Sequence, residues 1–441
     1  MSRSLRVAPG GSLSGSLRVP GDKSISHRAV MLGAIADGVT EITGFLEGAD
    51  AISTMQIFRA LGVRIDGPQA GHVTVHGVGL HGLRAPAGAL DCGNAGTAMR
   101  LLMGLLAGQR FESTLVGDES LSKRPMRRVA EPLAAMGARI ETREGCPPVR
   151  ILPVEALHGI RYRLPMASAQ VKSALLLAGL YAQGETTVIE PAPTRDHTER
   201  MLGGFGVTVR RDGPAATLRG GQSLRASAID VPADISSAAF FLVGASIAPG
   251  SDLLLEHVGM NPTRTGIVDI LRLMGADIEV RDERVAGGEP VADLRVRAAA
   301  LRGIAVPPEL VPLAIDEFPV LFVAAACAHG RTVVTGAAEL RVKESDRIAV
   351  MVDGLRALGV EATPTADGMV IEGRGERAAV FAPGAVHAHA DHRIAMSFAI
   401  AGLRAAGELM VHDAANVATS FPGFEVLARA AGLRIEGHSQ A

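Results

Sequence analysis

The hydrophobic and polar positions of this chain follow one pattern six times. Each copy opens with a few polar residues, continues as an apolar stretch rich in small residues, and then reaches a glycine and a short β-branched run. An apolar stretch behind a polar cap predicts a helix, and a β-branched run behind a glycine predicts a strand. The copies begin at Asp22, Asn94, Ser168, Asp234, Asp316 and Asp391.

Glycines punctuate each copy at two places. We expect the first helix of each copy to end at a glycine, because glycine readily adopts the left-handed backbone that stops a helix. A second helix follows each strand and ends in an apolar-Gly-strand signature such as ALGVRI, ending at Ile65, or AMGARI, ending at Ile140. The glycines expected to end the first helices are Gly38, Gly108, Gly184, Gly250, Gly330 and Gly407.

The repeat predicts an α/β protein with two similar domains of three copies each. A chain of 441 residues exceeds one ordinary hydrophobic core, so more than one domain is expected. We place the first domain at residues 21–232 and the second at residues 233–441. Residues 1–20 precede the first copy. We expect them to add a strand to the second domain and so complete it, because the last copy ends the chain without an additional strand.

Parallel helices within one domain direct their N-termini to the same side. The partial positive charge of each helix start favours anions, so several starts together make an anion-binding surface. Two such domains facing each other are expected to form a cleft for an anionic ligand.

Composition narrows the class of protein. The chain is 47% hydrophobic and 20% charged, as expected for a folded protein, and its net charge of −2 argues against a nucleic-acid partner. Its three cysteines lack the spacing of a zinc site or a disulfide framework. No uninterrupted apolar stretch reaches membrane-spanning length, and the N-terminus lacks a secretion signal. We therefore expect a cytoplasmic enzyme without a membrane or nucleic-acid partner.

Only four of the 44 basic residues are lysines, and all four lie in polar segments just ahead of apolar runs. They are Lys23, Lys123, Lys172 and Lys343. The ammonium group of lysine is compact, whereas the guanidinium group of arginine is planar. Lysines in an arginine-rich chain therefore indicate positions where a guanidinium group would not fit. The alternative is a compositional drift from lysine to arginine in which these four lysines remain by chance.

Three segments are candidates for anion binding in the first domain. In GDKSISHR, Lys23, Ser24 and Arg28 lie within about one and a half helical turns. In CGNAGTAMR, Gly96 allows a ligand to approach the backbone closely. In SLSKRPMRR, Lys123 and Arg124 crowd around a proline. Each segment could instead be a solvated helix start.

A fourth segment, MASAQVKS, places polar side chains at the start of an otherwise apolar helix. Ser168 and Gln170 are its candidate ligand contacts. Lys172 could be either a ligand contact or a structural cap.

Two segments in the second domain carry the candidate acid–base groups. AIDEFP places Asp316 at a helix start, where a carboxylate on a basic surface suits a general base. RVKESDR brings Lys343, Glu344 and Arg347 into one turn, and adjacent opposite charges tune each other's proton affinity. Capping and salt bridging are the structural alternatives. HADHR suggests a metal site, but it has no partner cluster, so Arg393 is the favoured functional residue there.

These segments together resemble one family, the 3-phosphoshikimate 1-carboxyvinyltransferases or EPSP synthases, and within it the class II enzymes. The resemblance runs nearly end to end and in order, through PGDKSISHR, GNAGTAMR, SKRPM, ASAQVKSALLLAGL, IDEFP, RVKESDR and DHRIAM. It implies an inside-out α/β barrel fold of two domains, each with three βαβαββ units, and a monomer without cofactor or metal. It also implies transfer of the enolpyruvyl group of phosphoenolpyruvate to the 5-hydroxyl of shikimate 3-phosphate, with release of phosphate.

The resemblance also assigns residues to each substrate. It implies Asp316 as the base on the 5-hydroxyl, with Glu344, together with Lys23, moving the proton at the methylene of phosphoenolpyruvate. The shikimate 3-phosphate set is Lys23, Ser24, Arg28, Ser168, Gln170, Arg195, Asp316 and Lys343, of which Arg195 is implied to reach the phosphate. The phosphoenolpyruvate set is Lys23, Asn94, Gly96, Arg124, Gln170, Arg347 and Arg393.

The chain departs from the family pattern at two places. Thr419 stands where many members carry lysine, and Ser168-Ala169-Gln170 replaces Ser-Ser-Gln. Both features resemble the glyphosate-tolerant class, whereas Gly96 leaves room for that inhibitor, so tolerance stays open. Two rival functions are a UDP-N-acetylglucosamine enolpyruvyl transferase, whose usual loop cysteine is missing from residues 117–124, and a polyanion-binding module without catalysis.

Overall fold

Each predicted apolar stretch forms a helix that begins one or two residues after its polar start. The computed structural model describes residues 3–439. The side chain of Asp22 accepts a hydrogen bond from the N–H of Ile25 and so caps the first of these helices. Ser168 and Asp391 cap two others in the same way. The polar residues therefore satisfy backbone donors that the helix itself leaves unpaired.

The glycines behave differently from the prediction at the first helix of each copy. Gly108 alone of the six is the C-cap residue of its helix, and Gly38 and Gly330 already belong to strands with φ of 106° and 83°. The other five helices end before their glycines, and Gly38 and Gly330 lie instead at the start of the strand that follows. The second-helix glycines do follow the expected pattern: Gly62, for example, has φ 89° directly after the C-cap Leu61.

The first three copies supply six helices and the strands between them. The helices are α1 (Lys23–Ala34), α2 (Ala49–Ala60), α3 (Gly96–Ala107), α4 (Arg127–Ala135), α5 (Ala169–Gly179) and α6 (His197–Gly204). The strands are β3 (Asp37–Thr43), β4 (Arg64–Gln69), β5 (His72–Val78), β6 (Leu90–Asp91), β7 (Ser113–Val116), β8 (Arg139–Arg143), β9 (Cys146–Leu152), β10 (Leu157–His158), β11 (Arg161–Arg163), β12 (Ala182–Gln183), β13 (Glu185–Ile189), β14 (Val209–Asp212), β15 (Ala215–Arg219) and β16 (Ile229–Asp230).

The last three copies repeat this order. Their helices are α7 (Ile235–Ile247), α8 (Gly266–Leu273), α9 (Phe318–Ala326), α10 (Arg347–Ala357), α11 (His392–Ala401), α12 (Val417–Ser420) and α13 (Phe424–Ala431). Their strands are β17 (Asp252–Gly259), β18 (Asp277–Ala286), β19 (Glu289–Arg297), β20 (His329–Val334), β21 (Ala362–Pro364), β22 (Met369–Arg374), β23 (Gly384–His387), β24 (Leu409–His412) and β25 (Ile435–Ser439), and β1 (Arg3–Val7) and β2 (Ser14–Leu17) precede the first copy.

The four-stranded sheets share one topology. In the order β16-β3-β5-β4, the edge strand β16 runs parallel to β3, and the remaining pairs are antiparallel. The sheets β6-β7-β9-β8 and β11-β13-β15-β14 repeat this arrangement. The sequence repeat is therefore a repeat of one sheet-and-helix module, which confirms the predicted α/β class.

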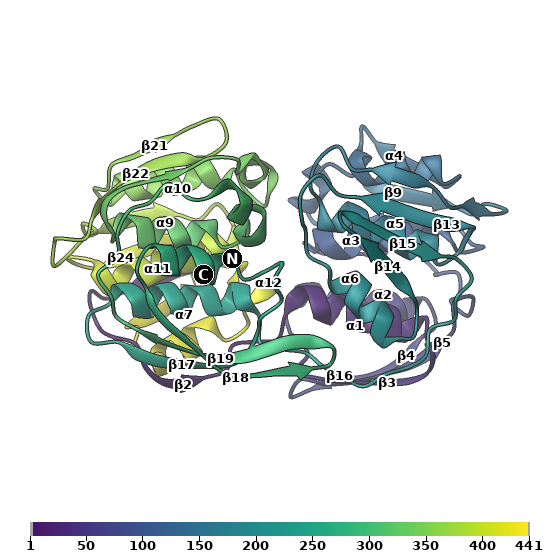
Figure 1. The fold of residues 1–441 in the computed structure, drawn as a ribbon, viewed down its shortest axis with the longest axis horizontal. Helices are drawn as coiled ribbons and strands as arrows, with labels where there is room; N and C mark the ends of the chain where they lie inside the picture. Colours follow the sequence, from purple (N-terminus) through teal and green to yellow (C-terminus); the bar gives the residue numbers. More distant parts are fainter. Residues whose placement is uncertain (1–2, 440–441) are drawn as a thin grey trace. The chain divides into compact units, whose positions relative to one another are not determined.

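The two N-terminal strands fill vacant places in this topology. In the sheet β23-β24-β1-β25, β1 holds the position that β5 holds in its own sheet. β2 runs parallel to β17 and supplies the edge strand of the sheet β18-β19-β17-β2 (Figure 1). The chain start therefore completes sheets that are otherwise built from the last three copies.

The described residues form two compact units. Unit 1 contains the residues up to Pro20, Pro232–Val285 and those from Pro290 onward, and unit 2 contains Gly21–Val231 and Ala286–Glu289. The short turn between β18 and β19 thus belongs to unit 2, although its strands belong to unit 1. Each unit has its own hydrophobic core, in which helices such as α3 and α5, or α9 and α11, pack against each other. Within residues 3–439, no helix combines the length and the apolar character needed to cross a membrane.

Candidate active site

In unit 2, α1 presents Lys23 and Ser24 at its first turn and buries Arg28 one turn later. The Arg28 guanidinium donates to Thr198 Oγ1 at 2.7 Å, to Ser173 Oγ at 2.9 Å and to the carbonyl of Ser24 at 2.9 Å. Arg28 therefore ties three helices together at the site where the sequence predicts anion binding. Such fixed, charge-assisted hydrogen bonds hold the guanidinium in one orientation.

Lys23 is paired with a carboxylate that sequence reasoning missed. Its Nζ lies 2.9 Å from Asp50 Oδ2, on the first turn of α2, and Asp50 is buried. Asp50 also belongs to a second polar chain, since its carbonyl accepts from Thr54, whose Oγ1 lies 2.7 Å from His27 Nδ1. The sequence signal was an acidic residue in the first turn of a predicted helix, which capping alone explains.

Asn94 and Arg124 are brought together next to the start of α3. Arg124 Nη2 lies 2.8 Å from Asn94 Oδ1 and 3.1 Å from Ser120 Oγ, and Asn94 Nδ2 donates to Asp118 Oδ2 at 2.7 Å. These contacts fix the Asn94 amide with its oxygen toward the cation.

Gly96 begins α3 between two guanidinium groups. A Cβ at this position would lie 3.2 Å from Arg100 Nη1 and 3.2 Å from Arg124 Nη1. Glycine therefore lets both cations approach the positive end of the helix closely. Together they make a concentrated anion-binding surface within unit 2.

Arg100 is a second site residue that the sequence did not single out. It is buried, and its Nη1 donates to Gln170 Oε1 at 2.7 Å, while Gln170 Nε2 donates to Thr97 Oγ1 at 3.0 Å. Both ends of the Gln170 amide are thus oriented by α3. The available signal was the arginine that ends GNAGTAMR, one turn after Gly96.

Ser168 caps α5, accepting from the N–H of Val171, and Arg195 lies half-buried just before α6. Lys172, left open by the sequence between cap and ligand contact, is neither. Its side chain is 0% exposed and its Nζ lies 2.5 Å from Glu190 and 2.8 Å from Glu199.

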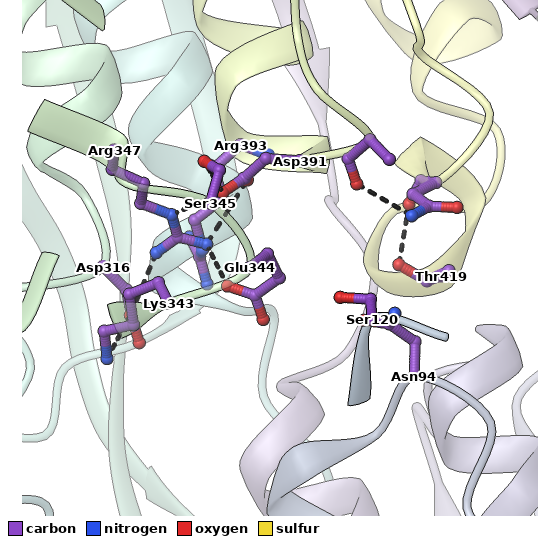
Figure 2. Close-up of polar contacts among 12 residues, drawn as sticks. Asn94, Ser120, Asp316, Lys343, Glu344, Ser345, Arg347, Asp391, Arg393 and Thr419 are labelled. Carbon is purple, nitrogen blue, oxygen red and sulfur yellow. Dashed lines mark hydrogen bonds and ion pairs between the residues drawn. The ribbon is translucent and has the colours of Figure 1, made fainter. Parts of the chain in front are cut away.

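In unit 1, the candidate acid–base residues surround a fully buried arginine. Arg347 Nη2 lies 2.6 Å from Glu344 Oε2, Nη1 lies 3.5 Å from Asp316 Oδ1, and Nε lies 2.8 Å from Asp391 Oδ2 (Figure 2). The structure therefore gathers Asp316, Glu344 and Arg347 into one cluster, although Asp316 is distant in sequence. We call these residues, with Lys343 and Asp391, the Arg347 cluster.

The partners of Arg347 differ in exposure. Asp391 is buried, whereas the side chains of Asp316 and Glu344 are 12% and 19% exposed. Lys343, 20% exposed, lies 3.2 Å from Asp316 and 3.0 Å from Glu339. One side of the Arg347 cluster is therefore buried, and the other side has carboxylates that solvent can reach.

Electrostatics keep the central pair ionised. Burial alone lowers the pKa of Arg347, but the carboxylates of Asp391, Glu344 and Asp316 outweigh it and raise that pKa. Burial likewise raises the pKa of Asp391, yet the Arg347 charge reverses this effect and the net pKa is lowered. The guanidinium therefore stays a fixed positive charge beside Asp316 and Glu344.

Asp391, the carboxylate in HADHR, is bound by other groups of the protein and is therefore not available to a metal ion. Its carboxylate bonds Arg347, the hydroxyl of Ser345 at 3.0 Å and the N–H of Arg393 at 2.9 Å. Arg393 is half-buried in the first turn of α11. Thr419, at the position of the missing lysine, donates its hydroxyl to the Asn416 carbonyl at 2.7 Å (Figure 2).

Known proteins resemble the whole of this chain. A family model described as EPSP synthase (3-phosphoshikimate 1-carboxyvinyltransferase) matches residues 7–427. A 3-phosphoshikimate 1-carboxyvinyltransferase from Alkalilimnicola ehrlichii is 67% identical, with 98% of each chain covered. A protein of the same name from Nitrosococcus oceani is 64% identical over 97% of this chain and 96% of the relative.

A solved structure agrees with these sequence matches. An EPSP synthase from Acinetobacter baumannii superposes with a TM-score of 0.90 at 58% identity, over 99% of this chain and 100% of that one. Fold and relatives thus define the class of protein as a transferase with a two-domain α/β fold. The chain belongs to the EPSP synthase (3-phosphoshikimate 1-carboxyvinyltransferase) family, which confirms the family expected from the motifs.

Proposed function

We propose that this enzyme transfers the enolpyruvyl group of phosphoenolpyruvate to the 5-hydroxyl of shikimate 3-phosphate and releases phosphate. The observation that carries the proposal is the Arg347 cluster, in which one buried guanidinium holds Asp316 and Glu344 by separate nitrogens. Two carboxylates fixed in this way can serve two different proton transfers in one reaction.

The reaction needs a proton moved at each of two atoms. In the addition step, Asp316 takes the proton of the 5-hydroxyl as its oxygen attacks C2 of phosphoenolpyruvate, and C3 gains a proton. In the elimination step, C3 loses a proton as the C2–phosphate bond breaks and phosphate leaves. Glu344, together with Lys23, is proposed to give and take the proton at C3.

Both substrates are polyanions, and the proposed binding residues lie largely at helix starts. For phosphoenolpyruvate, Gly96 supports the proposal because it lets Arg100 and Arg124 approach the N-terminus of α3. The proposed set is Lys23, Asn94, Gly96, Arg124, Gln170, Arg347 and Arg393. For shikimate 3-phosphate the proposed set is Lys23, Ser24, Arg28, Ser168, Gln170, Arg195, Asp316 and Lys343.

Phosphate release with different acceptors tests the proposal. We expect the purified enzyme to release phosphate from phosphoenolpyruvate with shikimate 3-phosphate as acceptor and not with UDP-N-acetylglucosamine. Release with the UDP-sugar alone would overturn the assignment, and release with neither acceptor would favour a binding module. The monomeric state and cytoplasmic location stay predictions, as does the division at residue 232.

A further inference from the structure

Lys172 is buried in unit 2 with every one of its donors matched to an acceptor. Its ammonium group contacts the carboxylates of Glu190 and Glu199 and lies 3.4 Å from the carbonyl of Thr194. An ammonium group has three N–H donors, and three acceptors surround this one. A charge removed from water is tolerated only when it is paired and hydrogen-bonded in this way.

Glu190 connects this lysine to the segment that precedes α6. One carboxylate oxygen of Glu190 faces Lys172, and the other accepts both the N–H of Thr194 at 3.0 Å and its hydroxyl at 2.7 Å. Thr194 therefore has its N–H, its carbonyl and its side chain bound to the same buried ion pair. The next residue in the chain is Arg195.

The residues on the other side of Arg195 are also fixed. Asp196 pairs with Arg200 at 2.9 Å, and His197 Nδ1 lies 2.9 Å from Oε1 of the buried Glu289 at the start of β19. Thr198 donates to Ser173 Oγ at 2.7 Å, next to Lys172 on α5. The backbone around Arg195 is thus held from both sides.

We propose that Lys172 is a positioning residue that acts through Glu190 and Thr194 to place the Arg195 guanidinium for the phosphate of shikimate 3-phosphate. The inference rests on the proposed function. A flexible arginine on an unrestrained segment loses conformational freedom when it binds an anion, and fixing its backbone beforehand removes part of that cost. Arginine cannot replace this lysine, because a planar guanidinium does not match three acceptors around a compact ammonium.

A double-mutant cycle on the dissociation constant of shikimate 3-phosphate tests this proposal. Calorimetry would compare the wild type, Lys172→Met, Arg195→Ala and the double variant. We expect each single change to weaken binding about tenfold to a hundredfold, as for loss of an oriented hydrogen bond to a charged group. The double variant should bind no more weakly than Arg195→Ala. Additive losses, which mean that the two residues act independently, would overturn the proposal.

Two controls separate positioning from a merely structural role. Glu199→Gln removes a carboxylate from Lys172 and from Arg211 without touching Thr194, and it should leave the dissociation constant near the wild-type value. Shikimate lacks the phosphate, so its affinity should be the same in the wild type and Lys172→Met. An equal loss for shikimate and shikimate 3-phosphate would contradict a role through Arg195.

A milder variant guards against loss of folding. Thr194→Val keeps all the charges and removes only the hydroxyl bond to Glu190, so it should bind shikimate 3-phosphate more weakly than the wild type and shikimate equally well. Unchanged affinity in this variant would count against the proposal. A wild type that does not bind shikimate 3-phosphate would instead refute the proposed function.

Discussion

The Lys172 cluster, which consists of Lys172, Glu190 and Glu199, and the Arg347 cluster both place carboxylates around a buried cation, but they differ in exposure. In each, a cation with a 0–1% exposed side chain contacts at least two carboxylates. Glu190 and Glu199 are buried with their lysine, whereas Asp316 and Glu344 remain partly exposed beside Arg347. A closed cluster fixes structure, and an open one leaves carboxylates able to exchange protons with a substrate.

The largest effect is expected from neutralising the exposed carboxylates of the Arg347 cluster. Asp316→Asn and Glu344→Gln should each lower kcat by about 10²–10⁴-fold, the usual contribution of a general acid or base. Steady-state kinetics at saturating substrates measures this loss, and thermal unfolding should show an intact fold. Glu339→Gln is the matched control, because Glu339 also contacts Lys343 but has no proposed role. If kcat falls less than tenfold in both variants, the partly exposed carboxylates of the Arg347 cluster are not the general acid and base.

Removing the central cation of the closed cluster should lower stability as well as weaken the binding of shikimate 3-phosphate. Among the described residues, Lys172→Met leaves Glu190 and Glu199 with only Arg211 as a cationic partner, and should lower the free energy of unfolding by about 3 kcal/mol, the low end for a broken buried ion pair. Lys343→Met should cost clearly less, because that lysine is partly exposed. Urea unfolding of both variants makes the comparison, with the exposed Lys123→Met as reference. Equal losses at positions 172 and 343 would mean that exposure does not distinguish the clusters.

Exchanging the site lysines for arginine should affect turnover and spare the fold. Lys23→Arg and Lys343→Arg keep the charge but change its shape, and each should lower kcat/KM about tenfold to a hundredfold, equivalent to one charged hydrogen bond. Kinetics and circular dichroism on the same samples separate the two effects. Near-normal rates would show that these positions need only a positive charge.

A smaller effect is expected from His27, which lies near Lys23 but acts only on stability. Burial, then the charges of Lys23 and Arg28, lower its pKa from 6.5 to about 3. Between pH 6.5 and 3 the His27 imidazole is therefore protonated in the unfolded chain and neutral in the folded chain. Stability falls as pH falls through this window. By pH 5 the loss should reach about 2 kcal/mol relative to pH 7.5. Urea unfolding at both values should show this loss in the wild type and not in His27→Asn; an equal loss in both proteins would assign the acid sensitivity elsewhere.

Much of the fold could be predicted because the local signals agree with one another. Polar caps such as Asp22 and Asp391 marked helix starts within one or two residues, and the recurrence of one pattern indicated repeated modules. The exact helix ends could not be predicted, since Gly38 and Gly330 serve the turn into a strand as readily as a helix end. The turn Ala286–Glu289 also escaped prediction, because its neighbours in space are far away in sequence.

The sequence by itself determined the module, the family and the segments that carry the candidate chemistry. Only the tertiary structure decided what each charged residue does within those segments. Lys172 and Lys343 look alike in sequence, each in a polar segment ahead of an apolar run, yet one is enclosed by two carboxylates and the other remains partly exposed. The physical reason is that the role of a charge depends on its burial and its partners, and residues as distant as Asp316 and Asp391 become partners of one arginine only when the chain has folded.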